Sequence, residues 1–311
     1  MGVMPRTQTT ETTRPIKHLN KRVLTNWLSF FVFSGPALIV FAIFMLYPLA
    51  NMFHVSTLDW EGLIKPSVNI GLANYEKLFT HDRHFSTALL NTAIQIAIAL
   101  PGTIFPAFIL GFFLSLRWPG YRILRTVYFS PVMLAAPGVS MLFLGLYLPD
   151  GIINFLLRQF GLESLTHVWL ADVNTSLLAV TAVEIWAGIG FYTVLFFGVL
   201  SNIPREIYEA ALMEGANLWE ILWKIVFPMT LDFFGVVLML HYMWLLLGAA
   251  QNVLLLTQGG PGDSSLTLGF YLYKQAFQIR DLGYSQAIGV FIFFVGLAGM
   301  LVIRLATHRK Y

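Results

Sequence analysis

Ile203-Pro-Arg-Glu-Ile-Tyr-Glu-Ala-Ala-Leu-Met-Glu-Gly-Ala-Asn-Leu-Trp-Glu-Ile-Leu-Trp-Lys-Ile-Val-Phe-Pro228 is the stretch around which the chain is organised. It predicts a first short helix that begins at Pro204, because the fixed backbone angle of proline suits a first turn and Asn202 lies close enough to cap it. Gly215 ends this helix, since glycine enters the left-handed region at no steric cost. A second helix follows and ends at Pro228. Residues 203–228 therefore predict a helical hairpin.

Both predicted helices carry apolar residues at helical spacing. The face of the first helix is mostly small and consists of Ile207, Ala210, Ala211 and Glu214. The second helix has two faces, one with Leu218, Ile221, Leu222 and Ile225 and another with Trp219, Trp223 and Phe227. Glu220 and Lys224 form an i, i+4 pair that faces water. A hairpin with apolar faces of its own is suited to docking on another protein.

The composition is that of an integral membrane protein. Hydrophobic residues make up 57% of the 311 residues and charged residues only 11%, whereas soluble domains carry about 25% charged residues. The chain has no cysteine, which excludes disulfides and thiolate metal sites. The net charge of +3 is interpreted as a topological bias and not as a nucleic-acid footprint, so no nucleic-acid partner is expected.

Six apolar runs are long enough to cross a bilayer. They cover residues 28–53, 86–116, 123–148, 177–201, 229–256 and 285–306. Prolines within these runs predict kinks, which are tolerated where neighbouring helices or a cavity satisfy the freed carbonyls; they are Pro36, Pro101, Pro106, Pro131 and Pro137. Residues 1–27 are polar and basic and predict a disordered cytoplasmic tail. Residues 28–311 then form one all-α transmembrane domain.

The distribution of basic residues predicts the orientation. With the N-terminus inside, the cytoplasmic segments hold 13 of the 19 lysines and arginines and the external segments hold 6. Basic residues concentrate on the cytoplasmic side of membrane proteins. Both termini and the hairpin are therefore expected in the cytoplasm.

The hairpin resembles the "EAA" signature of permease subunits in binding-protein-dependent ABC importers. The resemblance implies a type I permease with six transmembrane helices, whose hairpin is the coupling helix inserted into a cytoplasmic ATPase. The residues that match the family's motif, and for which the resemblance implies the coupling role, are Glu209, Ala210, Ala211, Glu214, Gly215, Ile225 and Pro228. Departures from the family pattern are Glu214 for Asp, Phe227 for Leu, and Asp232 for a second proline.

Two further stretches narrow the resemblance to carbohydrate importers of the maltose type. The first resembles the segment that leads into the second span of these importers, and it consists of Gly71-Leu-Ala-Asn-Tyr75 through Phe85 and of Ala88–Thr92. The second is similar to their Thr-x-Gly-Gly-Pro loop, and it is Leu256-Thr-Gln-Gly-Gly-Pro261. The resemblance covers residue 28 to the C-terminus. It implies a second permease, two cytoplasmic ATPase subunits, an extracytoplasmic sugar-binding protein and a prokaryotic cytoplasmic (inner) membrane. ATP and Mg are then bound by the partner ATPase, and no cofactor is expected in this chain.

Enzymatic and metal chemistry find little support. No Gly precedes any Lys, so the chain has no Gly-x4-Gly-Lys-Ser/Thr phosphate loop, and ATP hydrolysis is assigned to a partner. His81, Asp82 and His84 have the spacing of metal ligands, but they stand in an expected external loop without further ligands. A solvated loop is favoured there, and no metal site is predicted.

Glu184 is the one carboxylate in the middle of an apolar run, where an ionisable group is costly and is a functional candidate. In maltose-type permeases a similar stretch lines the sugar site, and the matching residues are Glu184, Trp186, Gly188 and Phe191. Tyr242, Gln251 and Asn252 are further candidates in the fifth run. Alternatively, Glu184 pairs with another helix or with the partner permease. His241 is interpreted as a packed interior residue.

Two other functions stay open on the residues alone. An ion-coupled secondary transporter would use intramembrane carboxylates, although a single Glu and the lack of a repeated half give it little support. A membrane scaffold that does not transport is the other alternative. The sequence does not name the sugar.

Overall fold

The computed structural model describes residues 32–62 and 66–308, so the predicted tail lies outside the described residues. The chain divides into two units, Met1–Met52 and Phe53–Tyr311. In the first unit the described residues are helical and include the π-helical turn η1 (Ala42–Leu46) and the start of α2 (Tyr47–Val55). The helical stretch Val32–Val55 is long and apolar enough to cross a membrane.

The second unit begins with short elements that the sequence did not reveal. Strand β1 (Leu58–Asp59) pairs antiparallel with β2 (Val68–Asn69), with Leu58 opposite Asn69. Helix α3 (Ala73–Glu76) and the π-turn η2 (Lys77–His81) follow. Strands of two residues leave no alternation of apolar and polar positions long enough to be recognised.

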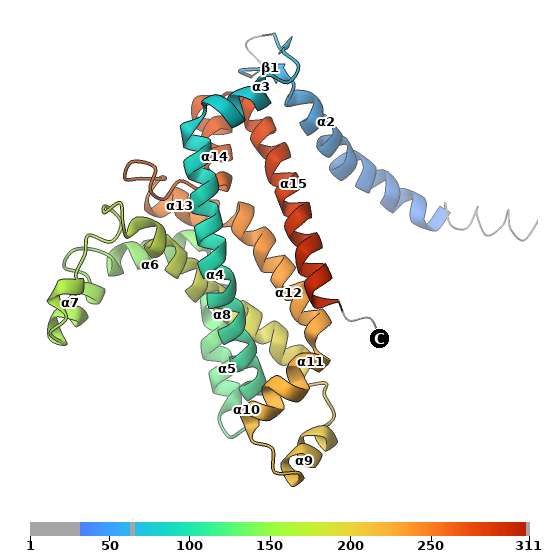
Figure 1. Ribbon diagram of the computed structural model, residues 1–311, viewed down its shortest axis with the longest axis vertical. Coiled ribbons are helices and arrows are strands. Elements are labelled where there is room, and N and C mark those ends of the chain that lie inside the picture. Colours follow the sequence, from blue (N-terminus) through green and yellow to red (C-terminus); the bar gives the residue numbers. More distant parts are fainter. Residues whose placement is uncertain (1–31, 63–65, 309–311) are drawn as a thin grey trace, which may run out of the picture. The chain divides into compact units, whose positions relative to one another are not determined.

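Long apolar helices form the body of this unit (Figure 1). They are α4 (Arg83–Ser115), α8 (Ser176–Leu200), α12 (Leu231–Met243) continued by the π-turn η6 (Trp244–Gly248), and α15 (Leu282–Thr307). With Val32–Val55, five described helices have the length and composition of membrane spans, and a bent pair gives a sixth if it counts as one span. Helix α4 packs along α8, and α12 packs along α15. The chain is thus a multi-pass membrane protein.

The bent pair stands where a span over residues 123–148 was predicted. Helix α5 (Tyr121–Phe129) and the 3-10 turn η3 (Ser130–Met133) meet α6 (Ala136–Leu146) at an angle of 98°. Leu134 and Ala135 at the break have extended backbones. Pro137 has no N–H to donate to the preceding turn, which weakens the helix at this point, whereas α4 continues through Pro101 and Pro106 as one helix. The kink that the prolines predicted is therefore a sharp bend.

Shorter elements complete the described chain. After α6 come α7 (Ile152–Gln159) and η4 (Glu163–Leu165); between α12 and α15 lie α13 (Ala250–Leu256), α14 (Leu268–Tyr273) and η7 (Lys274–Ile279). The predicted hairpin contains α9 (Arg205–Met213), α10 (Leu218–Glu220), the π-turn η5 (Ile221–Val226) and α11 (Phe227–Met229). The Gly-Gly-Pro stretch forms the expected turn, with positive φ at Gly259 and Gly262 and a cis Gly260–Pro261 bond.

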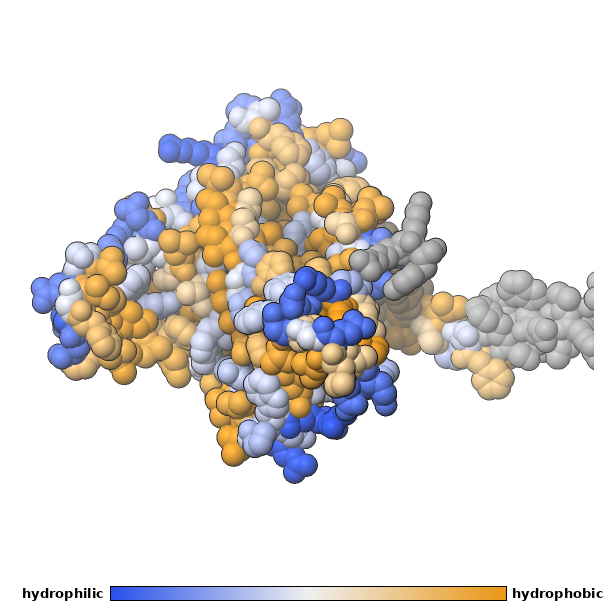
Figure 2. Space-filling model, turned by 60° about the horizontal axis from the view of Figure 1, so that its bottom comes forward, coloured by the Kyte–Doolittle hydropathy of each residue, from blue (hydrophilic) through white to orange (hydrophobic). Residues whose placement is uncertain are grey.

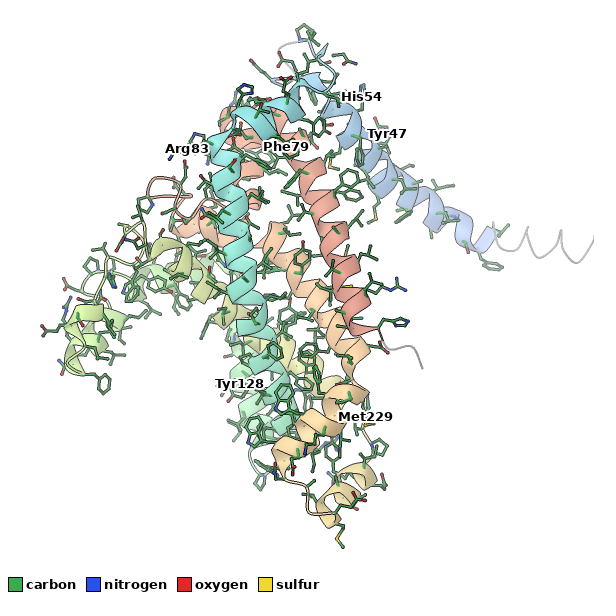
Figure 3. All side chains as sticks on the ribbon, in the orientation of Figure 1. Tyr47, His54, Phe79, Arg83, Tyr128 and Met229 are labelled. Atoms are coloured by element: carbon green, nitrogen blue, oxygen red, sulfur yellow. The ribbon has the colours of Figure 1, made fainter. Side chains whose placement is uncertain are left out.

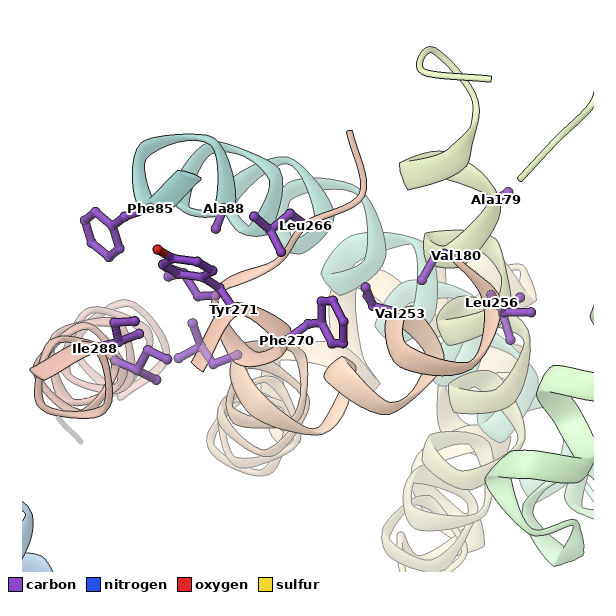
Figure 4. Packing of buried hydrophobic residues seen from close by; sticks show 14 of the residues in the cluster. Phe85, Ala88, Ala179, Val180, Val253, Leu256, Leu266, Phe270, Tyr271 and Ile288 are labelled. Carbon is purple, nitrogen blue, oxygen red and sulfur yellow. The ribbon is translucent and has the colours of Figure 1, made fainter. Parts of the chain in front are cut away.

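Two large apolar clusters, with a small third one at Ala99, Leu245 and Ala249, hold the helices together. Figure 4 shows part of one cluster, in which Phe85 and Ala88 of α4 lie near Tyr271 of α14 and Ile288 of α15. The second cluster joins α4, α8 and α12 to the hairpin through a group of buried phenylalanines, namely Phe108, Phe112, Phe196 and Phe234.

The ends of the second unit carry different elements. Figure 3 places Phe79 and Arg83 near one end and Tyr128 and Met229 near the other, where the hairpin lies. Figure 2 shows hydrophobic residues over much of the surface in view. Exposed apolar surface of this extent is what a lipid environment requires.

Candidate functional site

The first helix of the hairpin ends as predicted. Gly215 has a φ of +84°, and its N–H donates to the carbonyl of Leu212 at 3.0 Å. The N–H of Ala216 donates to the carbonyl of Ala211, also at 3.0 Å, so the two bonds form a Schellman motif. The start of α9 differs from the prediction: Pro204 occupies the N-cap position and no side chain caps the helix. The predicted Asn202 cap is therefore wrong, because Pro204, whose ψ of 136° is extended, separates Asn202 from the first turn.

The second helix begins with a capping box that was not predicted. Asn217 Oδ1 accepts from the backbone N–H of Glu220 at 3.0 Å, and Glu220 Oε2 accepts from the N–H of Asn217 at 3.1 Å. The predicted Glu220–Lys224 pair is present at 2.8 Å, and its hydrogen bond lowers the pKa of Glu220. Pro228 does not end the helix as predicted. It lies inside a helical run that continues from η5 into α11, with helical backbone angles at Phe227, and the break comes at Thr230.

One side of the hairpin is buried and the other is exposed. Ile221 and Leu222 are fully buried, and Ala211 is 6% exposed, in the cluster that joins the hairpin to the spans. At the turn, Leu212 and Met213 are 51% and 88% exposed. Exposed apolar side chains at a turn, beside polar ones, are typical of a docking surface.

The predicted docking residues divide between these two sides. Glu209, Ala210, Glu214 and Gly215 are exposed, whereas Ala211 is buried and Ile225 and Pro228 are partly buried. Ala211 and Ile225 therefore hold the hairpin to the spans, and the four exposed residues are accessible to a partner protein.

A cavity of about 350 Å³ lies between α8, α12 and the bent pair. The bend supplies a mostly aliphatic wall with Pro131, Val132, Leu134, Ala136 and Val139. Helix α8 supplies Glu184, Ala187, Gly188, Phe191 and Tyr192, and the opposite side supplies His241, Trp244 and Asn252. Non-helical backbone at membrane depth is tolerated where it lines a cavity, which accounts for the break at Leu134.

A hydrogen-bond network sets one wall of the cavity. Glu184 is 3% exposed, and its Oε1 accepts from Asn252 Nδ2 at 2.6 Å while Oε2 accepts from Trp244 Nε1 at 3.0 Å. Ser140 Oγ on α6 donates to Asn252 Oδ1 at 2.9 Å. The carboxyl of Glu184 thus joins α8 to η6 and α13, and Asn252 extends the network to α6. Both interpretations of Glu184 have a basis in this geometry, since it lines a cavity and also bonds neighbouring helices.

Glycine allows α5 to come close to α8. A Cβ added to Gly190 would collide with the carbonyl oxygen of Tyr128. Any larger residue would push α5 away and change the wall that Pro131 and Val132 form.

The structure brings together some of the predicted cavity residues and separates others. Glu184, Gly188 and Phe191 line the cavity, because positions i, i+4 and i+7 share one helical face. Trp186 does not line it; its ring packs 5.2 Å from Phe143, since residues two apart do not face the same way.

The predicted candidates of the fifth run are also separated. The Tyr242 hydroxyl donates to the carbonyl of Val295 at 2.9 Å, and Gln251 is exposed and outside the lining. Of the two neighbouring amide side chains, Gln251 and Asn252, it is Asn252 that donates a hydrogen bond to Glu184. His241 is buried as predicted, with its ring 4.8 Å from that of Tyr192, and it also lines the cavity.

The end opposite the hairpin contains a polar cluster around Asp82. The hydroxyls of Tyr271 and Tyr284 both donate to Asp82 Oδ2, and the N–H of Phe85 donates to Oδ1 at 3.0 Å. Burial alone would raise the pKa of Asp82, but these hydrogen bonds together outweigh it and hold the pKa below its ordinary value. Asp82 thereby ties α4 to α14 and α15.

His81 and His84, the other two residues with the spacing of metal ligands, contact other side chains. His84 Nδ1 is 2.6 Å from Asp263 Oδ2, and His81 Nδ1 is 2.5 Å from Thr80 Oγ1. Within residues 32–62 and 66–308, no three His, Cys, Asp or Glu side chains gather closely enough to hold a metal ion.

Comparison with known proteins links the fold to transport. Residues 99–310 match the family model described as "Binding-protein-dependent transport system inner membrane component". The chain is 34% identical to the probable ABC transporter permease protein YurN of Bacillus subtilis (strain 168), over 86% of this chain and 92% of that protein. It is 30% identical to the diacetylchitobiose uptake system permease protein NgcF of Streptomyces coelicolor, over 90% of this chain and 82% of that protein.

A solved structure shares the fold. A chain from the crystal structure of a bacterial alginate ABC transporter, in complex with an alginate pentasaccharide-bound periplasmic protein, matches with a TM-score of 0.79 and 20% identity. The match covers 95% of this chain and all of that one.

Proposed function

Since the chain belongs to the family of binding-protein-dependent transport system inner membrane components, we propose that it forms half of the pathway by which an ATP-driven importer carries a carbohydrate across a prokaryotic cytoplasmic membrane. The other half is a second, related permease. An extracytoplasmic binding protein delivers the sugar, and two cytoplasmic ATPase subunits bind ATP and Mg and supply the energy. The cavity beside Glu184 is the observation that carries this proposal.

The chemistry of the cavity suits a sugar ring. Aromatic side chains such as Phe191 and Trp244 offer faces to the C–H groups of a sugar, and fixed polar groups meet its hydroxyls. The oxygens of Glu184 each accept one hydrogen bond within the chain and retain capacity for another. A volume of about 350 Å³ accepts a small sugar unit. The named relative that takes up diacetylchitobiose supports the same class of substrate.

The hairpin is the proposed contact with the ATPase. Its exposed residues combine the carboxylate of Glu209 with the apolar side chains of Leu212 and Met213. Protein interfaces use this combination, in which apolar contacts supply binding free energy and a charge sets the orientation.

Substitutions in the cavity test the proposal. Glu184→Ala and Asn252→Ala should lower sugar uptake by reconstituted importer at least tenfold, while the ATPase still copurifies. Gln251→Ala is the matched comparison, since this amide is adjacent in sequence but outside the cavity, and it should transport at close to the wild-type rate. Normal uptake by every Glu184→Ala complex that assembles, with fewer complexes formed, would assign Glu184 a purely structural role.

Orientation is tested separately by cysteine labelling, because the natural chain has no cysteine. Single cysteines at Tyr75 and Phe160 should react with an impermeant reagent in intact cells. Cysteines at Gly120 and Leu212 should react only after permeabilisation. External labelling at Leu212 would contradict both the orientation and the ATPase contact.

A further inference from the structure

A second pocket, of about 270 Å³, lies at the hairpin end of the molecule and shares no lining residue with the cavity beside Glu184. It is bounded by the last residues of α4 and α8 and by the first turn of α9. Its lining consists of Ser115, Leu116, Arg117, Leu200, Ser201, Ile203, Arg205, Tyr208 and Glu209. The pocket therefore joins two spans to the hairpin.

The charges around this pocket favour an anion. Arg117 and Arg205 line it from opposite elements, and neither forms an ion pair with any described residue. Glu209 is the one carboxylate in the lining, which leaves a net positive charge. Guanidinium groups present planar sets of donors that match phosphate and carboxylate oxygens.

Two hydroxyl groups at the pocket are buried without hydrogen-bond partners. The Ser201 hydroxyl has no partner in the described residues, and the Tyr208 hydroxyl lies beside Ser115 without a hydrogen bond of normal geometry. A buried hydroxyl left unpaired is destabilising. With the two arginines, the hydroxyls make four donor groups at one pocket, which suits a group with several acceptor oxygens.

Neighbouring residues place this pocket at the level of lipid headgroups. Trp118 directly follows Arg117 and is exposed, and tryptophan concentrates at membrane–water interfaces. Helix α5 has exposed Ile123 and Val127 together with Arg122 and Arg125. Arginines near the end of a span extend their side chains to the level of the headgroups.

We propose that this pocket binds the phosphate of an anionic phospholipid headgroup, held by Arg117, Arg205, Ser201 and Tyr208. Basic pockets between spans at the level of the headgroups are suited to anionic lipids. The bound headgroup bridges the ends of α4 and α8 to the first turn of α9 and steadies the hairpin. The inference goes beyond transport and requires only that the hairpin end lies at a membrane surface.

Lipid titration of the full-length permease tests the proposal. The protein is placed in phosphatidylcholine nanodiscs, short-chain phosphatidylglycerol is added, and bound lipid is measured by native mass spectrometry. Arg117→Gln and Arg205→Gln should each weaken binding about tenfold or more, as expected for loss of a charge-assisted hydrogen bond. Arg122→Gln removes the same charge from the same end but lies outside the pocket, and it should bind nearly as the wild type does.

Removing the hydroxyls gives a readout that a purely structural role would not produce. Tyr208→Phe and Ser201→Ala should keep or raise thermal stability in phosphatidylcholine alone, because each removes an unpaired buried group. The same variants should bind phosphatidylglycerol more weakly and gain less stability from it. Lower stability without anionic lipid, combined with unchanged lipid binding, would overturn the assignment.

The remaining arms distinguish a lipid headgroup from a soluble anion, from diffuse surface attraction and from a protein contact. Saturable binding of inorganic phosphate that Arg117→Gln abolishes, without any phosphatidylglycerol effect, would overturn the lipid assignment in favour of a soluble anion. An equal loss of lipid in Arg122→Gln and Arg117→Gln would show diffuse surface attraction and overturn the pocket. Arg205→Gln that keeps lipid binding but loses the ATPase would assign this arginine to the protein interface instead. Normal sugar uptake in the cavity variants would contradict the proposed function but would leave all of these lipid results unaffected.

Discussion

Glu184→Gln is the most informative single change, because it keeps the shape of the side chain and alters only its hydrogen bonding. The carboxyl accepts from Asn252 and from Trp244. A glutamine amide has one acceptor and one donor group, so one of the two natural donors would face another donor. Each arrangement of the amide therefore loses one hydrogen bond and leaves a buried donor unpaired.

The expected loss follows from these contacts. A hydrogen bond to a charged group contributes about 1.5–3 kcal/mol, but pairwise hydrogen bonds between transmembrane helices contribute only about 0.6 kcal/mol on average and about 1.7 at most. We expect Glu184→Gln to lower the free energy of unfolding by about 1–1.7 kcal/mol, in the upper part of the membrane range, because the side chain is buried and accepts from two donors. The measurement is denaturant unfolding of the purified chain in mixed micelles.

A compensating change makes the prediction sharper. In the double variant Glu184→Gln with Asn252→Asp, the glutamine amide donates to the aspartate, Trp244 donates to the glutamine oxygen, and Ser140 donates to the second aspartate oxygen. Every partner is then satisfied again, and most of the lost stability should return. Asn252→Asp alone should be destabilising, since two carboxylates would face each other. Wild-type stability of Glu184→Gln, or a double variant no better than the sum of its single changes, would refute the network of accepted hydrogen bonds.

Three other changes test other parts of the molecule. Glu209→Lys should leave the chain inserted but weaken ATPase attachment by about 1.5–3 kcal/mol, the contribution of a charge-assisted contact; quantitative copurification at the wild-type level would contradict this. Asn217→Ala removes the capping box and should cost about 0.5–2 kcal/mol of stability, measured by thermal unfolding. Asp82 has a lowered pKa, so its stabilising contribution is present above the ordinary aspartate value of about 3.9 and is lost as pH falls through its folded pKa. Asp82→Asn should therefore be less stable at neutral pH and lose less stability on acidification than the wild type, whereas Asp150→Asn, at an exposed site, should behave as the wild type.

The hairpin was predictable from sequence because its signals are local. Gly215, the two apolar faces and the Glu220–Lys224 pair all act within one or two turns, and each is present. The capping box could also have been read, since Asn217 and Glu220 have the required spacing of three. The sharp bend at Leu134 was only partly predictable. Prolines indicate where a helix weakens, but the angle depends on what packs around the break.

The cavity was harder to predict because nearly every residue of a membrane span is apolar, so helical periodicity carries little information. Glu184 was found through the cost of burying it, and Gly188 and Phe191 follow from its helical face. The same spacing rule could have excluded Trp186. The choice of Asn252 over Gln251 was not readable, because the π-turn η6 shifts the register before α13 begins. Trp244 had no signal in the sequence that connected it with Glu184.

The hairpin continues into α12 through a single residue. Helical structure runs from Leu218 to Gly248 and is interrupted only at Thr230. Trp244 lies about 21 Å along the helix from Thr230. A rotation of α12 by about 10° about Thr230 would therefore move Trp244 by about 4 Å, which is enough to break its 3.0 Å hydrogen bond to Glu184. A force on the hairpin that produced this rotation would remove one polar contact at the cavity wall and widen the space beside it.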